Sequence, residues 1–503
     1  MNDYLYSLIV ELDRQERLHI TNTLKSNKKN TILLNFFSYL CDQKKFDEKH
    51  IKASIQNKTL QKFYPQYKRK LYDAILKAMR QYNKSQPIEK KLYDQLKDIT
   101  FLFEKGRINE AFSLIEKGQK VAKKHQVYEL ELLFLKWKLL LTSKVGSLTT
   151  KKKTFNDVQA RVNICLKTNE GLFLNRLKHY TYLFEKKNTL INLPPQKRSI
   201  ASKNLLKKLD IQMDINNSSE INYGYHLLHY QIYLLENNLV KVKFHLEKAV
   251  NIIEEKTNKT IRDYHNYVIG LANLIEIAFL NRNIKEMDKY LSNLIEVDKK
   301  YGKNVLIRPL TRNYIPLFQL HYDILTNQNS NEKPIQKVEF QIENEQNENN
   351  VRSSLCLAAA THYWLQKNYS KALDYILIFK DFQNQSINFY AYKFLELIIY
   401  YELKEYQLLD SKTRSIYRYL SEQDQYNKVE RAVLKAVKKG IHAKNKEETK
   451  EIIRQLVNFI KTSEHDSNII SLRYIYFEEW FEAELSGESV QDIFKKQLVS
   501  VPT

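Results

Sequence analysis

Apolar side chains recur at helical spacing from the first residues of the chain onward. The first stripe comprises Leu5, Leu8, Ile9 and Leu12. Residues 31–40 supply a second stripe of the same kind, and Pro87 interrupts the pattern. Because one apolar face per helix must be buried against a neighbour, residues 1–86 predict a small N-terminal helical domain.

From about residue 89 a helix–turn–helix pattern returns along the chain. Each copy ends one helix, passes through a short polar turn, and begins a second helix with an inward-facing residue. The copies occupy residues 103–118, 236–249, 280–291, 365–376 and 402–409. The inward-facing residues are Ala111, Val242, Met287, Ala372 and Leu409. The intervals between the second, third and fourth are 45 and 85 residues, close to one and two steps of about 43, which indicates an internal repeat.

These segments resemble the tetratricopeptide repeat, in which a small residue early in the second helix lets it pack closely on the first. The resemblance covers residues 89 to 465, with a longer step than the family's usual 34 residues. Only Ala360 and Tyr363 match the family's small and aromatic first-helix positions. The resemblance implies an all-α fold, an α-solenoid of about eight helix pairs. The layout, a small helical head before an array, is also similar to helical-repeat proteins of Bacteroidota.

The resemblance also implies a concave groove in which first-helix positions capture a peptide. Carried over residue by residue, these positions include Tyr93 and Phe103 in the first repeat, where Leu96 and Thr100 accompany them. In the repeat that contains Met287 they are Ile269, Ala272, Glu276 and Phe279. In the best-matching repeat they are Ser354, Leu357, Thr361 and Trp364. Trp364 and Phe279 are expected to anchor a partner if exposed and otherwise to pack in the core.

Composition changes suggest how the chain is divided. We expect an N-terminal domain at 1–86, the array at 87–466 and C-terminal capping helices at 467–503. Residues 143–157 are polar and basic and predict a long loop. Residues 327–350 are rich in Asn, Gln and Glu and predict a flexible insertion, with the short strand-like run VEFQI inside it.

The net charge of +23 raises a second possibility, nucleic-acid binding. Lysine accounts for 63 of the 81 basic residues, a bias that AT-rich coding alone produces. The charge is nevertheless uneven, since residues 118–210 carry +14 and residues 421–503 carry −1. The candidate phosphate contacts are Lys144, Lys151, Lys152, Lys153 and Arg161.

Several kinds of chemistry find no support in the sequence. The closest two glycines, Gly106 and Gly118, are too far apart for a phosphate-binding loop. Cys41, Cys165 and Cys356 form no CxxC pair, which indicates a reducing setting without disulfides. His226 and His229 share a helix face, but no further ligand at a recognisable spacing completes a metal site. We therefore expect no catalytic residues, no metal and no cofactor.

The sequence predicts a cytoplasmic protein without a membrane span, because the acidic N-terminal segment does not resemble a signal peptide and the apolar runs are short. The leading hypothesis is a non-enzymatic scaffold or adaptor whose concave groove binds a peptide or a partner helix. The alternative is a nucleic-acid-binding protein, with a regulatory role, that uses the basic N-terminal domain and residues 118–210.

Overall fold

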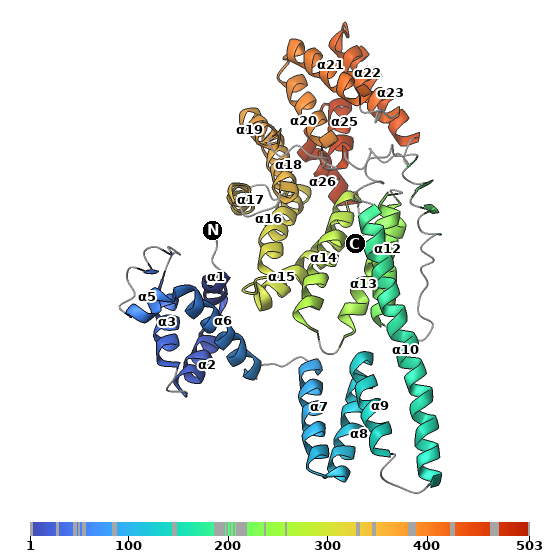
Figure 1. Ribbon diagram of the computed structural model, residues 1–503. Helices are drawn as coiled ribbons and strands as arrows, with labels where there is room; N and C mark the ends of the chain where they lie inside the picture. Colours follow the sequence, from blue (N-terminus) through green and yellow to red (C-terminus); the bar gives the residue numbers. More distant parts are fainter. Residues whose placement is uncertain are drawn as a thin grey trace. The chain divides into compact units, whose positions relative to one another are not determined.

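The fold is all-α, as the sequence predicted. The computed structural model describes residues 4–26, 30–43, 57–82, 88–142, 148–185, 219–235, 238–256, 259–327, 332–344, 349–380, 389–422, 428–462 and 472–500, with a few single positions between these segments. Within these segments every regular element is a helix and none is a strand. Figure 1 shows how these helices follow one another along the chain. Successive helices with short connections pair with one another, which is consistent with a helical-repeat fold.

The chain divides into two compact units, residues 1–147 and 148–503. The first unit contains α1 (Tyr4–Glu11), α2 (Arg14–Lys25), α3 (Thr31–Asp42), α5 (Lys58–Lys62), α6 (Tyr64–Gln81), α7 (Ile88–Glu104), α8 (Ile108–Lys124) and α9 (Tyr128–Thr142). One core joins helices α1 to α6 and a second core joins α7 to α9. The division into two units follows Ser147, so the expected first repeat falls in the first unit.

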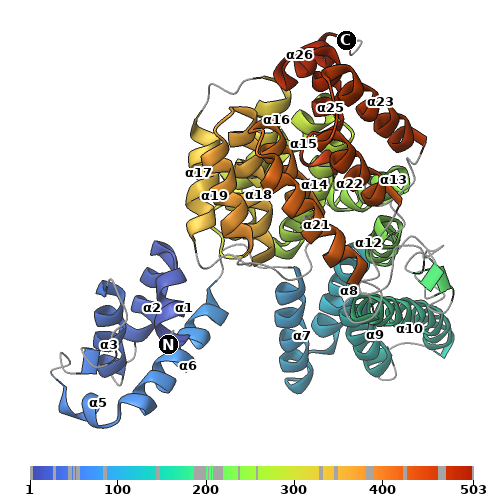
Figure 2. The same cartoon turned by 90° about the horizontal axis from the view of Figure 1, so that it is seen from above.

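The second unit carries the remaining helices; one continuous core joins those from α13 onward, and α10 packs against α12. It contains α10 (Leu148–Glu185), α12 (Ser219–Leu235), α13 (Leu239–Glu254), α14 (Ile261–Leu280), α15 (Ile284–Tyr301), α16 (Arg308–Leu325), α17 (Lys333–Glu343), α18 (Asn349–Leu365), α19 (Tyr369–Lys380), α20 (Phe389–Glu402), α21 (Tyr406–Glu422), α22 (Lys428–Ile441), α23 (Lys446–Thr462), α25 (Phe477–Ser486) and α26 (Val490–Ser500). The first helices of successive pairs contact one another, α14 against α16 and α16 against α18 (Figure 2).

One turn geometry links the helices of most pairs. At the α14–α15 turn Arg282 takes a left-handed conformation (φ +54°), and the backbone N–H of Asn283 donates to the carbonyl of Ala278 at 2.8 Å. The Asn283 side chain then caps α15 by accepting from the backbone N–H of Glu286 at 3.1 Å. The same bond, from the backbone N–H of the first residue to the carbonyl of the second, is formed by Arg107 and Leu102, Val127 and Ala122, Asn238 and Tyr233, Asn368 and Tyr363, and Glu405 and Tyr400. The polar turns seen in the sequence are thus helix C-caps that reverse the chain.

The inward-facing positions at the start of the second helices are all buried. Their exposed fraction is 1% or less at Ala111, Val242, Met287, Ala372 and Leu409. Each second helix therefore packs on its partner through this position, and a larger or polar residue there would disturb the pair.

Two segments that we expected to be irregular form helices. Residues 148–157 begin α10, whereas residues 143–147 lie outside the described residues. Within the expected insertion, residues 333–343 form α17 and the VEFQI run is helical, so both predictions are wrong there. The reason is that Ile335, Val338 and Ile342 share one face and are buried where α17 packs against α16 and α18. Residues 328–331 and 345–348 lie outside the described residues.

The segment that contains α25 contacts helices that are far from it in the sequence. Residues 473–484 make hydrogen bonds with α14, with the α14–α15 turn and with α20, so the end of the described chain packs against helices from the middle of the unit. No helix in the described part of the chain is long and apolar enough to cross a bilayer.

Candidate functional site

A cavity of about 240 Å³ lies among α14, α16 and α18 of the second unit. Its lining comprises Glu276, Phe279, Asn313, Tyr314, Leu317, Phe318, His321, Val351, Ser354, Leu355, Leu357, Ala358 and Tyr474. Four of the groove positions predicted from the sequence are among them, namely Glu276, Phe279, Ser354 and Leu357. The structure therefore brings first-helix positions of two predicted repeats, α14 and α18, to one cavity, with α16 between them.

Glu276 is the one carboxylate among the described residues that line the cavity. Its Oε1 accepts a hydrogen bond from the hydroxyl of Tyr474, which comes from the segment before α25. Burial raises the pKa of Glu276, and the hydrogen bond from Tyr474 opposes that rise. Burial and the nearby Glu276 also raise the pKa of Tyr474, so its hydroxyl stays protonated and remains a donor.

His321 contributes a neutral imidazole to the cavity. Burial, together with the positive charge of Arg282, lowers the pKa of His321 to about 3. The imidazole ring lies 4.2 Å from the Phe279 ring, centroid to centroid, and its Nδ1 is 3.3 Å from the hydroxyl of Tyr476. A neutral imidazole can donate and accept one hydrogen bond each, so His321 adds polarity to the cavity without charge.

The C-terminal segment that supplies Tyr474 is fixed by a buried ion pair. Arg282 Nε donates to Glu479 Oε1 at 2.5 Å, and Arg282 Nη2 donates to Glu479 Oε2 at 3.1 Å and to the carbonyl of Arg473 at 2.9 Å. Only 2% of the Glu479 side chain is exposed. Tyr476 takes a left-handed backbone conformation (φ +50°) directly before α25. These contacts set the position of the Tyr474 ring at the cavity.

Two other groove candidates of the second unit, Trp364 and Thr361, are core residues, and Phe279 is itself only 1% exposed although it borders the cavity. Trp364 is buried, and its indole N–H donates to Glu402 Oε2 at 3.1 Å. Thr361 is fully buried, and its hydroxyl donates to the carbonyl of Leu357 at 2.8 Å. Neither lines the cavity, and both pack in the core. The α18 helix contacts α20, and the bond from Trp364 to Glu402 is one of these contacts.

Tyr93 and Phe103 belong to the first unit and do not line this cavity. Tyr93 is exposed on α7, while Phe103 is half-buried and packs edge-on against Trp137 with 5.4 Å between ring centroids.

The candidate phosphate contacts lie near the start of α10. Lys144 lies outside the described residues, as do the side chains of Lys151 and Lys152. Lys153 is exposed, and Arg161 is half-buried. The segment that carries Lys151, Lys152 and Lys153 is thus helical and not the expected loop.

Sequence reasoning missed the residues of α16, although a signal was present. Since the predicted groove positions on α14 and α18 are 85 residues apart, an intermediate repeat should lie half-way between them. Adding 42 to positions 272, 276 and 279 gives Tyr314, Phe318 and His321, and all three line the cavity. Tyr474 had no such signal, because it lies outside the repeats.

A second cluster of polar rings lies between α12 and α13. His226 and His229 are joined by His245, whose Nδ1 is 2.9 Å from the Nδ1 of His226 and whose ring stacks on His229. Burial and the neighbouring histidines lower the pKa of His226 and of His245 to about 4. Within the described residues no group of three or more His, Cys, Asp or Glu side chains is arranged to hold a metal ion. The cluster is a packed set of neutral imidazoles.

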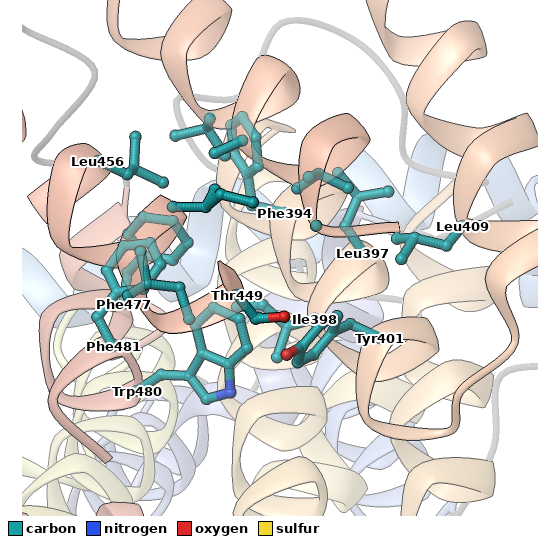
Figure 3. A pocket seen from close by; sticks show the side chains of 16 residues that line it. Phe394, Leu397, Ile398, Tyr401, Leu409, Thr449, Leu456, Phe477, Trp480 and Phe481 are labelled. Carbon is teal, nitrogen blue, oxygen red and sulfur yellow. The ribbon is translucent and has the colours of Figure 1, made fainter. Parts of the chain in front are cut away.

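A buried cysteine and a small apolar cavity are two further features of the second unit. Cys356 is fully buried, and burial raises the pKa of its thiol to about 12. An apolar cavity of about 60 Å³ lies between α20, α22, α23 and α25 (Figure 3). Leu397 and Ile398 face it from one side, and Phe477 and Phe481 from the other (Figure 3). A cavity of this size with an apolar lining is a packing gap, not a site with specific chemistry.

No protein-family model and no curated protein matches the sequence.

Proposed function

We propose that this protein is a non-enzymatic scaffold or adaptor, built on a tetratricopeptide-like α-solenoid, which binds a peptide or partner helix at the cavity among α14, α16 and α18. The observation that carries the proposal is the cavity itself. It lies at positions where the resembling family captures peptides, and it combines aromatic walls with a few polar groups. The scattered cysteines support a reducing, cytoplasmic setting.

The dimensions of the cavity determine what part of a partner it can hold. A volume of about 240 Å³ corresponds to about eight water molecules, which is far too small for a whole helix. It fits one or two side chains of a partner that lies across α14, α16 and α18. Side chains that fill a pocket lined by aromatic rings commonly dominate the affinity of an interface, because they are fully desolvated there.

Peptide binding is favoured over nucleic-acid binding at this site. None of the described residues that line the cavity is Lys or Arg, so it offers no cation to a phosphate. A peptide anchored by an enclosed side chain should bind with little dependence on salt. A nucleic acid held through phosphates should lose affinity steeply as salt rises.

The test is selection of peptides from a random dodecamer display library on the immobilised full-length chain. Affinities of the enriched peptides are then measured at 50 and 300 mM NaCl. The Ser354→Phe variant fills the cavity from α18 and should weaken binding at least tenfold. The matched control is Ser292→Phe, the same change at an exposed position of α15, which should leave affinity within twofold.

Two results would count against the proposal. One is the absence of any enriched peptide, and the other is equal affinity in wild type and Ser354→Phe. A parallel titration with a 20-nucleotide single-stranded probe tests the nucleic-acid alternative. If this probe binds at 50 mM NaCl and loses its affinity at 300 mM, nucleic-acid binding is favoured.

A further inference from the structure

The charge inside the cavity is opposite to the charge of the chain as a whole. The sequence carries 81 basic and 58 acidic residues, yet among the described residues that line the cavity there is one carboxylate, Glu276, and no Lys or Arg. The nearest arginine along α14 and its turn, Arg282, is already paired with Glu479. Glu276 therefore faces the cavity without a basic neighbour in the lining. A half-buried carboxylate in this position is stabilised by any cation that enters.

The walls around Glu276 suit an organic cation. Phe279, Tyr314, Phe318 and Tyr474 bring four aromatic rings to the lining, of which the Phe279 ring is 1% exposed and already contacts His321 and Arg282. The face of an aromatic ring attracts a cation, and the attraction is stronger when water is excluded. His321 is neutral because burial keeps its pKa near 3, so it does not repel a positive ligand.

The lining also suits a cation that carries N–H donors. The side chains of Asn313, Ser354 and Tyr314 border the cavity beside the Glu276 carboxylate. An ammonium group has three donors and a guanidinium has five, and neither can accept a hydrogen bond. A carboxylate ligand would meet Glu276 with the same sign of charge, and a purely apolar side chain would bury Glu276 without a counter-charge.

We propose that the cavity binds the basic side chain of a partner, the ammonium or guanidinium group pairing with Glu276 while its aliphatic stem packs on Phe279, Tyr314 and Phe318. This inference rests on the proposed function, because it names the part of the peptide that the cavity recognises. A lysine side chain has five heavy atoms beyond the backbone, and a cavity of about eight water volumes accommodates it.

The experiment uses small probes on the full-length chain, so that it does not depend on finding a peptide. Saturation-transfer NMR is recorded with the N-acetyl N-methylamides of lysine, arginine, norleucine and glutamate at about 5 mM. We expect the lysine or arginine probe to receive at least fivefold more saturation than norleucine, and the glutamate probe to receive the least. The comparison of lysine with arginine identifies which cation the cavity prefers.

Three variants assign the signal to Glu276. Glu276→Gln should reduce the signal of the cationic probe to that of norleucine. Glu296→Gln removes the same charge from an exposed position of α15 and should leave the signal unchanged. Tyr474→Phe removes the hydroxyl that donates a hydrogen bond to Glu276 and keeps the aromatic ring. The signal of the cationic probe should be equal or stronger in this variant.

Each outcome supports or overturns the inference. Equal saturation of lysine, arginine and norleucine on the wild-type chain overturns it, even if Glu276→Gln fails to fold. A cationic signal that persists in a folded Glu276→Gln variant also overturns it. If peptides are selected at the cavity but none needs a basic residue, the proposed function stands and this inference fails. If the cationic probes bind but no peptide does, the cavity is a cation site and the proposed function fails.

Discussion

The ion pair between Arg282 and Glu479 is the contact whose loss should most affect the C-terminal segment. It joins the α14–α15 turn to α25 across 197 residues of sequence. Arg282 makes two bonds to Glu479 and further bonds to the carbonyls of Phe279 (3.1 Å) and Arg473 (2.9 Å). Burial disfavours the charge of Arg282, and Glu479 more than offsets this, so the pKa of Arg282 is raised.

The expected magnitude follows from what remains after Glu479 is changed. Removing one partner of a buried pair costs about 3–5 kcal/mol, because the other charge stays buried. Glu479→Gln keeps one acceptor oxygen, and Arg282 keeps its two carbonyl partners, so we expect about 2–3 kcal/mol. Replacing both residues, as Arg282→Met with Glu479→Leu, leaves no buried charge. The stability of this double variant should differ from that of the wild type by less than about 1 kcal/mol.

Hydrogen–deuterium exchange of the α25 amides measures this locally. A loss of about 2–3 kcal/mol lowers the protection of these amides by roughly 30- to 150-fold. The matched control is the neighbouring Glu478→Gln, which breaks an exposed pair with Arg473 at 3.2 Å and should cost less than about 1 kcal/mol. Equal loss of protection in Glu478→Gln and Glu479→Gln, or a double replacement as damaging as the single one, would refute the reasoning.

Three further predictions concern other parts of the chain. Folded His226 and His245 have pKa values of about 4, below the ordinary 6.5, so their contribution to stability is complete above pH 6.5 and is lost as the pH falls toward 4. Urea unfolding should show a decrease on the order of 1 kcal/mol per histidine between pH 7 and 5, which a variant with both changed to Gln lacks. Gly118→Ala should destabilise the first unit by about 1–3 kcal/mol in thermal unfolding, because the new Cβ would lie 2.2 Å from the Phe134 ring; wild-type stability would contradict this contact. Changing lysines 151–153 to Glu should leave the affinity of cavity-binding peptides within twofold by fluorescence anisotropy, and a larger loss would implicate the start of α10 in peptide binding.

Much of the local structure followed from the sequence. The scarcity of Gly and Pro and the helical spacing of apolar residues predict an all-α chain, and the Asn-containing turns predict where pairs reverse. Positions such as Ala372 and Met287 are recognisable because a close helix pair needs a small or slender inward residue, and both are fully buried. The α17 helix was also recoverable, since Ile335, Val338 and Ile342 keep helical spacing within a segment whose polar composition favoured an insertion.

The candidate site was only partly recoverable. Glu276, Phe279, Ser354 and Leu357 were obtained from repeat positions, because residues at equivalent places in successive repeats line the same face. Trp364 occupies an equivalent place too, yet it is buried and bonded to Glu402. Repeat position specifies a side of the helix but not whether another helix covers it.

Only the tertiary structure decided that the C-terminal segment completes the cavity. Tyr474 meets Glu276 across 198 residues of sequence, and the Arg282–Glu479 pair holds it there. Hydrophobic periodicity and capping act over a few residues, so the sequence determined which segments are helical and where each begins and turns. The contact between Tyr474 and Glu276 depends on how all the intervening helices pack together. A pattern that spans a few residues of sequence carries no information about that packing.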